Sequence, residues 1–339
     1  MKPDRRSFIG MMSALVAVGR LDAQLEANPS RKTKLKGFKP VELRPLSIAV
    51  GASIPFKAVH LSDTHLVRAD ATDNDARKIE LAAQRYPQMG YGERYLTEAV
   101  MYARRQNAIL LHTGDLYDFV SGANLKLAEL LFGADDWFAC VGNHEFSQYV
   151  GEAKEDAEYK AVNAGRVDAV WPNGISFDSR IVNGVNFVAV DDTYYNFTTD
   201  QMSLMEKEVK KGLPIVMMCH VPIHMENHYA ELMRRTGGVC SYEVGVPDEL
   251  IDTWKKEPGI PAGEEWRDRR VQQRADAATL EFVKYLRAQP LLKAILSGHT
   301  HAFWQERFSP TAIQYVCSAT YKGEGYSIAF RGNCKTLLG

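Results

Sequence analysis

Short apolar runs alternate with longer segments of helical periodicity along most of the chain. Short continuous apolar runs of this length are consistent with buried strands. They predict strands at residues 57–62, 108–112, 137–141, 215–218 and 292–296. Apolar residues at helical spacing predict helices at residues 93–106, 123–132, 153–164 and 276–288, and a further helix that Thr199 or Asp200 caps and Gly212 ends.

The dipeptide Asn183-Gly184 separates two strand-like segments, residues 175–182 and 185–190. Asn-Gly tolerates the two positive φ angles of a type I′ turn, so we expect a β-hairpin here. The last part of the chain, residues 303–331, has the pattern of short strands separated by Pro and Gly. Strands that alternate with helices and end in a strand-rich tail predict an α/β domain, with two sheets packed together and helices outside.

Two segments interrupt this alternation. Residues 67–91 form a smaller insertion, and a long segment between His220 and His299 includes a polar stretch with Trp and Gly at about residues 236–275. Long loops in compact domains are usually functional or disordered, so we expect a cap-like insertion at 225–275, with a poorly ordered surface loop as the alternative. The whole domain is expected to cover residues 51–339, after a tether or edge segment at residues 24–50.

The first 23 residues resemble an export signal. A positive segment precedes a short apolar stretch at residues 8–18, which is too short to span a bilayer. The segment contains Arg5-Arg6-Ser7-Phe8-Ile9, which resembles a twin-arginine signal for the export of folded bacterial proteins. An ordinary secretory signal or an uncleaved amphipathic anchor is the alternative. We therefore expect a signal peptide at residues 1–23 and a periplasmic or secreted mature protein without a stable membrane span.

The composition disfavours some classes of binding partner and of structural site. The 339 residues include 41 Lys and Arg against 42 Asp and Glu, and 45% of them are hydrophobic, as in ordinary soluble globular proteins. The formal net charge of −1 disfavours a nucleic-acid polymer as the partner. The five cysteines show no C-x-x-C spacing, which disfavours a disulfide framework or a structural zinc cluster.

Five motifs rich in metal-binding residue types follow apolar runs. In chain order they are His60-Leu61-Ser62-Asp63-Thr64-His65, Gly114-Asp115-Leu116-Tyr117-Asp118, Gly142-Asn143-His144-Glu145, Cys219-His220 and Gly298-His299-Thr300-His301. Because ligands collect beyond the carboxyl ends of strands in open α/β sheets, we expect the motifs to converge on one edge. Asp63 and His65, two apart on an extended segment, would leave the same face, and the two oxygens of Asp115 could bridge two ions.

The order D-x-H, G-D-x-x-D, G-N-H-E, H, G-H-x-H resembles the calcineurin-like metallophosphoesterase superfamily over roughly residues 57–305. The resemblance implies a four-layer αββα sandwich of two mixed sheets flanked by helices, with two divalent metal ions at the sheet edge. It also implies that His144 acts as general acid or stabilises charge, and that Asp118 orients His144. Carried over by motif, one ion would be held by Asp63, His65, Asp115 and His301, and the other by Asp115, Asn143, His220 and His299.

The residues at and after Asp118 differ from those of two subfamilies of this superfamily. Phe119-Val120 follow Asp118, where the protein serine/threonine phosphatases of the superfamily carry Arg-Gly. Purple acid phosphatases place a tyrosine ligand where Asp118 stands. We therefore expect neither a protein phosphatase nor an iron–tyrosinate site. The identity of the metals stays open among Mn, Fe and Zn, because Asp, Asn and His suit several divalent ions.

The motifs favour a phosphoesterase that hydrolyses a small organic phosphate with metal-activated hydroxide. A phosphodiester is the favoured substrate, because cyclic-nucleotide and glycerophosphodiester hydrolases share these motifs. The alternatives are a nucleotidase-like or acid phosphatase-like phosphomonoesterase, and an inactive binding module of the same fold. Proximity to the motifs makes His224, Tyr117 and Arg68 candidates for contact with the substrate.

Overall fold

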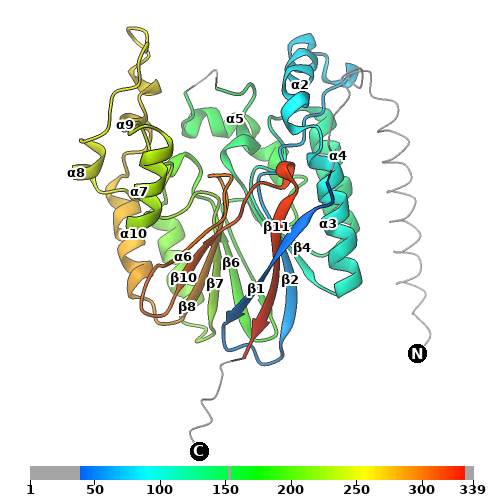
Figure 1. Cartoon of the computed structure of the whole chain (residues 1–339), viewed down its shortest axis with the longest axis vertical. Helices are drawn as coiled ribbons and strands as arrows, with labels where there is room; N and C mark the ends of the chain where they lie inside the picture. The colour runs from blue at the N-terminus through cyan, green and yellow to red at the C-terminus, as the bar shows by residue number, and fades with distance from the viewer. Residues whose placement is uncertain (1–38, 152–153, 333–339) are drawn as a thin grey trace, which may run out of the picture.

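Two β-sheets lie face to face at the centre of the protein (Figure 1). The computed structural model describes residues 39–151 and 154–332. The first sheet has five strands in the order β1-β11-β2-β3-β4, and the second has six in the order β5-β6-β7-β8-β10-β9. The strands are β1 Glu42–Ala49, β2 Phe56–Leu61, β3 Ile109–Thr113, β4 Trp137–Cys140, β5 Phe177–Val182, β6 Val185–Val190, β7 Ile215–Met218, β8 Leu292–Ser297, β9 Trp304–Arg307, β10 Ile313–Val316 and β11 Glu324–Arg331.

Both sheets are mixed. In the first sheet β2, β3 and β4 run parallel, while β11 is antiparallel to β2 and parallel to β1. In the second sheet β6, β7, β8 and β10 run parallel, and the antiparallel strands β5 and β9 form the edges. The parallel strands of each sheet place their carboxyl ends along one edge, and the five motifs follow such ends.

Apolar side chains fill the space between the sheets. Leu111 and Phe138 of the first sheet belong to the same buried cluster as Phe187 and Val216 of the second. The rings of Phe187 and Phe330 meet edge to face, with centroids 5.3 Å apart. Because helices cover the outer faces, the central strands are buried on both sides, which explains their continuous apolar runs.

Helices cover the outer face of each sheet (Figure 1). α3 (Gly92–Gln106) and α4 (Gly122–Ala134) pack against the first sheet in one buried cluster. α6 (Thr199–Val209) and α10 (Ala277–Ala288) pack against the second sheet in another. These four layers confirm the predicted αββα sandwich.

The predicted hairpin is present, whereas one predicted helix is displaced. Asn183 (φ 48°) and Gly184 (φ 79°) both adopt positive φ in the turn between β5 and β6. The helix predicted at residues 153–164 is α5 (Ala157–Asp168), which begins later along the chain. The Asp156 side chain caps α5 by accepting a hydrogen bond from the main-chain N–H of Tyr159.

The cap of α6 also differs from the prediction. Thr198, rather than Thr199 or Asp200, is the N-cap residue. The Thr198 hydroxyl accepts a hydrogen bond from the main-chain N–H of Gln201, and the Gln201 side chain accepts one from the N–H of Thr198. This reciprocal capping box satisfies two donors, which explains why the helix begins one residue after Thr198.

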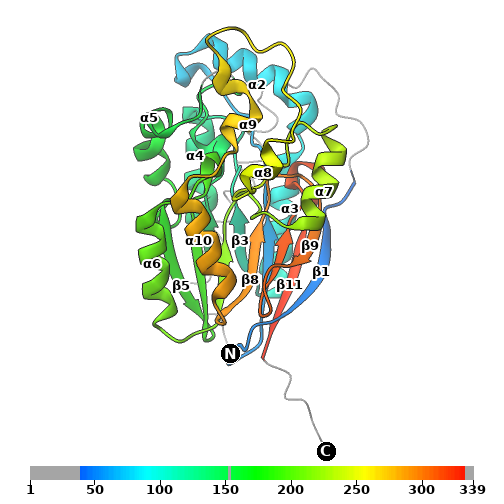
Figure 2. The ribbon, with the colours of Figure 1, turned by 90° about the vertical axis from the view of Figure 1, so that its left-hand side faces the viewer.

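Two segments add helices to this core. Residues 67–91 contain η2 (Ala71–Asp73) and α2 (Ala76–Met89). The segment 225–275, called the cap below, contains α7 (Glu226–Arg235), α8 (Asp248–Ile251), η5 (Glu265–Arg267) and α9 (Arg269–Gln272). Figure 2 shows α8 and α9 over one end of the sheets. The remaining short helices are η3 (Asn143–Phe146), η4 (Thr193–Tyr195) and η6 (Thr320–Lys322).

The amino-terminal predictions fall largely outside this structure. The expected signal peptide at residues 1–23 lies outside the described residues, as does most of the tether at 24–50. The end of that tether forms β1, an edge strand of the first sheet. Within the described part of the chain, no helix combines the length and the apolar character that crossing a membrane requires.

Candidate metal centre

The seven predicted ligands approach one another beyond the carboxyl ends of β2, β3, β4, β7 and β8. Six of them form two groups, and within each group the donor atoms lie within 4.8 Å of one another. Asn143 lines the same cavity as both groups. The first group is Asp63, His65 and His301, and the second is Asp115, His220 and His299.

Five of the seven residues have a left-handed backbone. The φ angle is 52° at Asp63, 47° at His65, 56° at Asp115, 65° at His299 and 52° at His301. Such angles are unfavourable for residues other than glycine, and they cluster at functional sites. The predicted extended segment at Asp63 and His65 is therefore wrong, because the chain turns at both residues. Their side chains nevertheless reach the same group.

Two motif glycines allow the loops to approach closely. A Cβ atom at Gly142 would lie 2.3 Å from Asp115 Oδ1. A Cβ atom at Gly298 would lie 1.8 Å from Ser62 Oγ and 2.5 Å from Asp63 Oδ2. Both positions therefore require glycine, which explains why it precedes Asn and His in these motifs.

The first group is compact. His301 Nε2 lies 3.1 Å from Asp63 Oδ1 and 3.2 Å from His65 Nε2. His65 Nε2 lies 3.9 Å from the same oxygen of Asp63. Burial raises the pKa of Asp63, but His301 and His220 more than offset this and hold it below its ordinary value. Asp63 is therefore ionised, as a cation ligand must be.

Asp115 belongs to the second group and also faces the first. Its Oδ2 lies 3.2 Å from His220 Nε2 in the second group and 3.8 Å from His65 Nε2 in the first. His299 Nδ1 completes the second group, 3.1 Å from His220 Nε2. Burial raises the pKa of Asp115, but the surrounding histidines, His220 first among them, hold it well below its ordinary value. The ionised carboxylate therefore faces donor atoms of both groups.

The protonation pattern of this site suits divalent cations. His220 Nδ1 donates to the carbonyl of Thr113 at 2.7 Å, and His65 Nδ1 donates to the carboxylate of Asp118 at 2.9 Å. Because these partners only accept, Nδ1 carries a proton in both rings, and Nε2 is the nitrogen that would bind a cation. Burial lowers the pKa of His220, but Asp115 and Asp63 raise it to about 10, so a cation at Nε2 would displace a proton there. Asn143 Oδ1 and Asp63 Oδ1 are buried and receive no hydrogen bond from any described residue. A bound cation would satisfy these oxygens, so the residues present fit the predicted metals.

Two tyrosines contact the outer nitrogens of the other histidines. The Tyr195 hydroxyl lies 3.1 Å from His299 Nε2, and the Tyr321 hydroxyl lies 3.2 Å from His301 Nδ1. Hydrogen bonds of this kind fix the ring orientation of metal-binding histidines. Neither tyrosine belongs to a motif, so the sequence carried no signal for either role.

The structure changes the predicted role of Asp118. Its carboxylate accepts a hydrogen bond from His65 Nδ1 at 2.9 Å and two from Arg85 of α2, from Nε at 2.6 Å and Nη2 at 2.9 Å. His144 Nδ1 instead donates to the main-chain carbonyl of Asp118 at 2.7 Å, and lies 3.5 Å from the carboxylate. Burial raises the pKa of Asp118, but His65 and Arg85 lower it below its ordinary value. Asp118 therefore orients His65 with its side chain and His144 with its main chain.

Glu145 joins two of the motif loops. Its side chain is fully buried and accepts hydrogen bonds from the main-chain N–H groups of Asp115 at 2.7 Å, Leu116 at 2.7 Å and Gly142 at 2.6 Å. One carboxylate thus fixes the position of Asp115 relative to the Asn143 loop. The sequence showed Glu145 as part of a motif but gave it no role.

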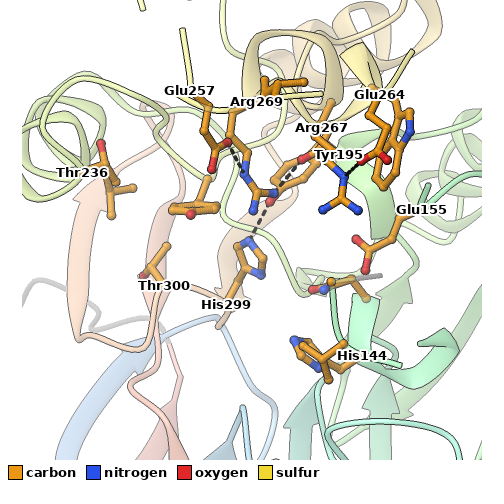
Figure 3. Close-up of a pocket in the computed structure, with 18 of the residues that line it drawn as sticks. His144, Glu155, Tyr195, Thr236, Glu257, Glu264, Arg267, Arg269, His299 and Thr300 are labelled. Atoms are coloured by element: carbon orange, nitrogen blue, oxygen red, sulfur yellow. Dashed lines mark hydrogen bonds and ion pairs between the residues drawn. The ribbon is translucent and has the colours of Figure 1, made fainter. Parts of the chain in front are cut away.

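A cavity of about 910 Å³ lies above the two groups (Figure 3). Its floor includes Asp115, Asn143, His144, His299 and His301. The cap supplies the opposite side, with Leu232, Arg235, Thr236, Tyr242, Glu257, Trp266, Arg267 and Arg269 among the lining residues. Glu155 lies between His144 and the cap. The cavity has room for an organic phosphate on the side of the metal groups that faces the cap.

The three predicted substrate contacts lie elsewhere. Tyr117 is fully buried in the core beside the first sheet. Arg68 pairs through two nitrogens with Glu93, and His224 Nδ1 lies 3.3 Å from Glu243 Oε2. None of these three residues lines the cavity. Adjacency in sequence to a motif is a poor guide here, because each side chain points into its own local contacts.

An αββα sandwich with Asp, Asn and His donors beyond the ends of its strands defines a metallophosphoesterase fold with candidate metal ligands. The model of the calcineurin-like phosphoesterase family matches residues 56–303, so the chain belongs to this family. It is accordingly a metal-dependent phosphoric ester hydrolase.

The fold is also similar to solved structures. A dimetal phosphatase from Danio rerio is 13% identical, with a TM-score of 0.46, over 78% of this chain and 88% of that one. A putative 5′-nucleotidase from Staphylococcus aureus is 13% identical, with a TM-score of 0.39, over 79% of this chain and 49% of that one. A phosphopantetheinyl hydrolase from Mycobacterium tuberculosis is 10% identical, with a TM-score of 0.35, over 83% of this chain and 92% of that one. Likenesses this distant carry no argument about function. Comparison with curated proteins gives no match.

Proposed function

We propose that the protein is a dinuclear metal-dependent phosphoesterase that hydrolyses small organic phosphates. The observation that carries this proposal is the position of Asp115, whose Oδ2 faces His220 at 3.2 Å and His65 at 3.8 Å. Divalent ions, when bound, supply Lewis acidity that offsets the charge of the phosphate and lowers the pKa of water. The inactive-module alternative is disfavoured, because both ligand groups and His144 are present in this chain.

His144 is the proposed proton donor. Its Nδ1–H is engaged by the carbonyl of Asp118 at 2.7 Å, and the ring lines the cavity. Burial lowers the pKa of His144, but the carboxylates of Asp115 and Asp118 raise it above its ordinary value. As a water oxygen forms a bond to phosphorus and the P–O bond to the leaving group breaks, the imidazolium can give its Nε2 proton to the leaving-group oxygen. The neutral ring then regains the proton that the attacking water has released.

Within this function we favour phosphodiesters over monoesters. The cavity extends to both sides of its floor, with Glu155 on one side and Thr236 on the other (Figure 3). A phosphate bound at the floor would have space for a substituent in each direction. A nucleotidase-like or acid phosphatase-like monoesterase is the alternative, and relative rates on matched monoesters and diesters distinguish the two.

The test uses the full chain loaded separately with Mn²⁺, Zn²⁺ or Fe²⁺. The substrates are 4-nitrophenyl phosphate and bis(4-nitrophenyl) phosphate. We expect hydrolysis of at least one ester, and a kcat about 10²–10⁴-fold lower for His144→Ala at unchanged metal content. A protein that binds two ions per chain and hydrolyses neither ester would refute the proposal and favour the inactive module.

We also propose export of the protein in folded form to the periplasm or beyond. The support is Arg5-Arg6 ahead of a short apolar stretch, which lies outside the described residues. Replacing both arginines by lysine in the full chain should retain the protein in the cytoplasm of a bacterial host. Export of this variant at the wild-type level would instead favour an ordinary secretory signal.

A further inference from the structure

Two arginines of the cap face the metal groups across the cavity. Figure 3 shows Arg267 and Arg269 on the side opposite His144 and His299. The cavity, at about 910 Å³, is much larger than a phosphate group needs. Most of its space therefore lies between the metal groups and the cap, where the rest of a substrate would be bound.

Most of the N–H donors of the Arg269 side chain make no hydrogen bond to a described residue. A guanidinium carries five N–H donors. Among the described residues, the Arg269 side chain donates one hydrogen bond, from Nη1 to Gln272 Oε1 at 2.6 Å. Its ion pair with Glu257 is long, 3.7 Å between Nε and Oε2, and the side chain is only 32% exposed. A half-buried cation with most donors unused is a favourable site for an anionic group.

Two other arginines of the cap are better paired. Arg267 forms a close ion pair with Glu264. Arg274 lies 2.9 Å from Asp248 Oδ1 and 2.6 Å from Asp252 Oδ1. Both charges are compensated within the cap itself. Arg269 thus differs from these two in facing the cavity without a close carboxylate partner. Arg235 of α7 also lines the cavity, and its Nη2 donates to the main-chain carbonyl of Thr300 at 3.5 Å, between His299 and His301.

Aromatic side chains connect Arg269 to the metal groups. Its guanidinium carbon lies 5.6 Å from the ring centroid of Tyr242, which in turn meets the ring of His299 edge to face at 5.8 Å. Tyr195 contacts His299 through its hydroxyl. Tyr242 (φ 54°) and Tyr195 (φ 67°) both have left-handed backbones, which other contacts must stabilise. These rings form a fixed apolar surface between the guanidinium and the metal ligands.

We propose that Arg269 binds a second anionic group on the leaving-group portion of the substrate. The substrate class is then an organic phosphate ester that also carries a carboxylate or a further phosphate, with a flat or apolar part against Tyr242. The scissile phosphate lies at the metal groups, and the second anion lies at the cap. This inference rests on the proposed phosphoesterase function.

The test compares aryl phosphates that differ in one substituent. The set is 4-carboxyphenyl, 4-carbamoylphenyl and 4-(phosphonomethyl)phenyl phosphate, each also as its methyl diester, with the metal-loaded full chain. We expect kcat/KM to be about 10- to 100-fold higher for an anionic substituent than for the neutral amide, as a charge-assisted hydrogen bond implies. The carboxylate and phosphonate arms show which anion is preferred.

The decisive variant is Arg269→Gln, with Arg274→Gln as the matched control. Arg269→Gln should reduce the anion-to-amide ratio to about one, and Arg274→Gln should keep the wild-type ratio. Equal losses on all substrates in Arg269→Gln would overturn the inference, because Arg269 would then act on the scissile phosphate. Hydrolysis with no preference for anions in the wild type would also overturn it while leaving the phosphoesterase function intact. Absence of hydrolysis on every ester would instead refute the proposed function.

Discussion

Replacement of Asp118 by Asn tests which histidine its carboxylate orients. The structure shows a hydrogen bond to His65, whereas the sequence led us to expect His144. Both carboxylate oxygens accept from Arg85, and Oδ1 also accepts from His65 Nδ1 at 2.9 Å. An Asn side chain has nearly the same shape, but its Nδ2 cannot accept a hydrogen bond. Whichever way the amide turns, Nδ2 faces a donor of Arg85. The Asp118→Asn protein therefore loses the ion pair and at least one hydrogen bond.

The size of the effect follows from burial. The Asp118 side chain is fully buried, and that of Arg85 is 26% exposed. A hydrogen bond to a charged group contributes about 1.5–3 kcal/mol, and breaking a fully buried pair costs about 3–5 kcal/mol. Because water screens the exposed part of Arg85, we expect the free energy of unfolding to fall by about 2–3 kcal/mol. A neutral amide, even where its oxygen faces His65 Nδ1, is a weaker acceptor than the carboxylate, so metal binding should weaken by about 10- to 100-fold.

Two measurements test this reasoning. Urea unfolding in excess chelator gives the stability without metal linkage, and competition with a chelating dye gives metal affinity. Asp135→Asn is a matched control, because Asp135 forms a similar pair with Arg104 at 2.6 and 2.7 Å. It should lose some stability and keep wild-type metal affinity. Wild-type metal affinity in Asp118→Asn, together with reduced kcat at saturating metal, would refute the role through His65.

Three further outcomes follow from the site. Chelation should abolish hydrolysis, and metal at 100 times its Kd should raise the free energy of unfolding by about 2.7 kcal/mol, as thermal or urea unfolding would show. Tyr195→Phe should weaken metal binding by about 10- to 100-fold through His299, and an unchanged dye competition curve would contradict this. Gly142→Ala should lower Tm and metal content because its Cβ would lie 2.3 Å from Asp115 Oδ1, whereas Gly165→Ala, with open space around it in α5, should raise Tm or leave it unchanged.

The strands and the identity of the motif residues were predictable for a physical reason. Strands buried on both faces are mostly apolar, so β4 and β7 are visible in the sequence as uninterrupted apolar runs. Metal-binding groups must be ionisable or polar, so Asp115 and His220 stand out at the ends of such runs. Because both signals depend on residue type and short spacing, sequence was enough to place them.

The supporting contacts were not predictable in this way. Arg85 lies on α2, 33 residues before Asp118, and its polar helix gave no sign of a buried partner. Tyr195 meets His299 from 104 residues away. The left-handed backbone at His301 has no signature in residue type, because such conformations normally favour glycine. Each of these features depends on how distant segments pack, which local patterns do not encode.

The floor of the cavity is tightly packed, whereas the cap side is held by few contacts. On the floor, a Cβ at Gly298 would lie 1.8 Å from Ser62 Oγ, so the motif loops have almost no freedom to change. On the cap, Arg269 belongs to a four-residue helix, donates a single side-chain hydrogen bond among the described residues and remains 32% exposed. Changes at Arg269 can alter contacts with the substrate without moving the strands that carry Asp115. Variants of Asp115 should therefore reduce activity on every ester alike, whereas variants of Arg269 should change the ratio between esters.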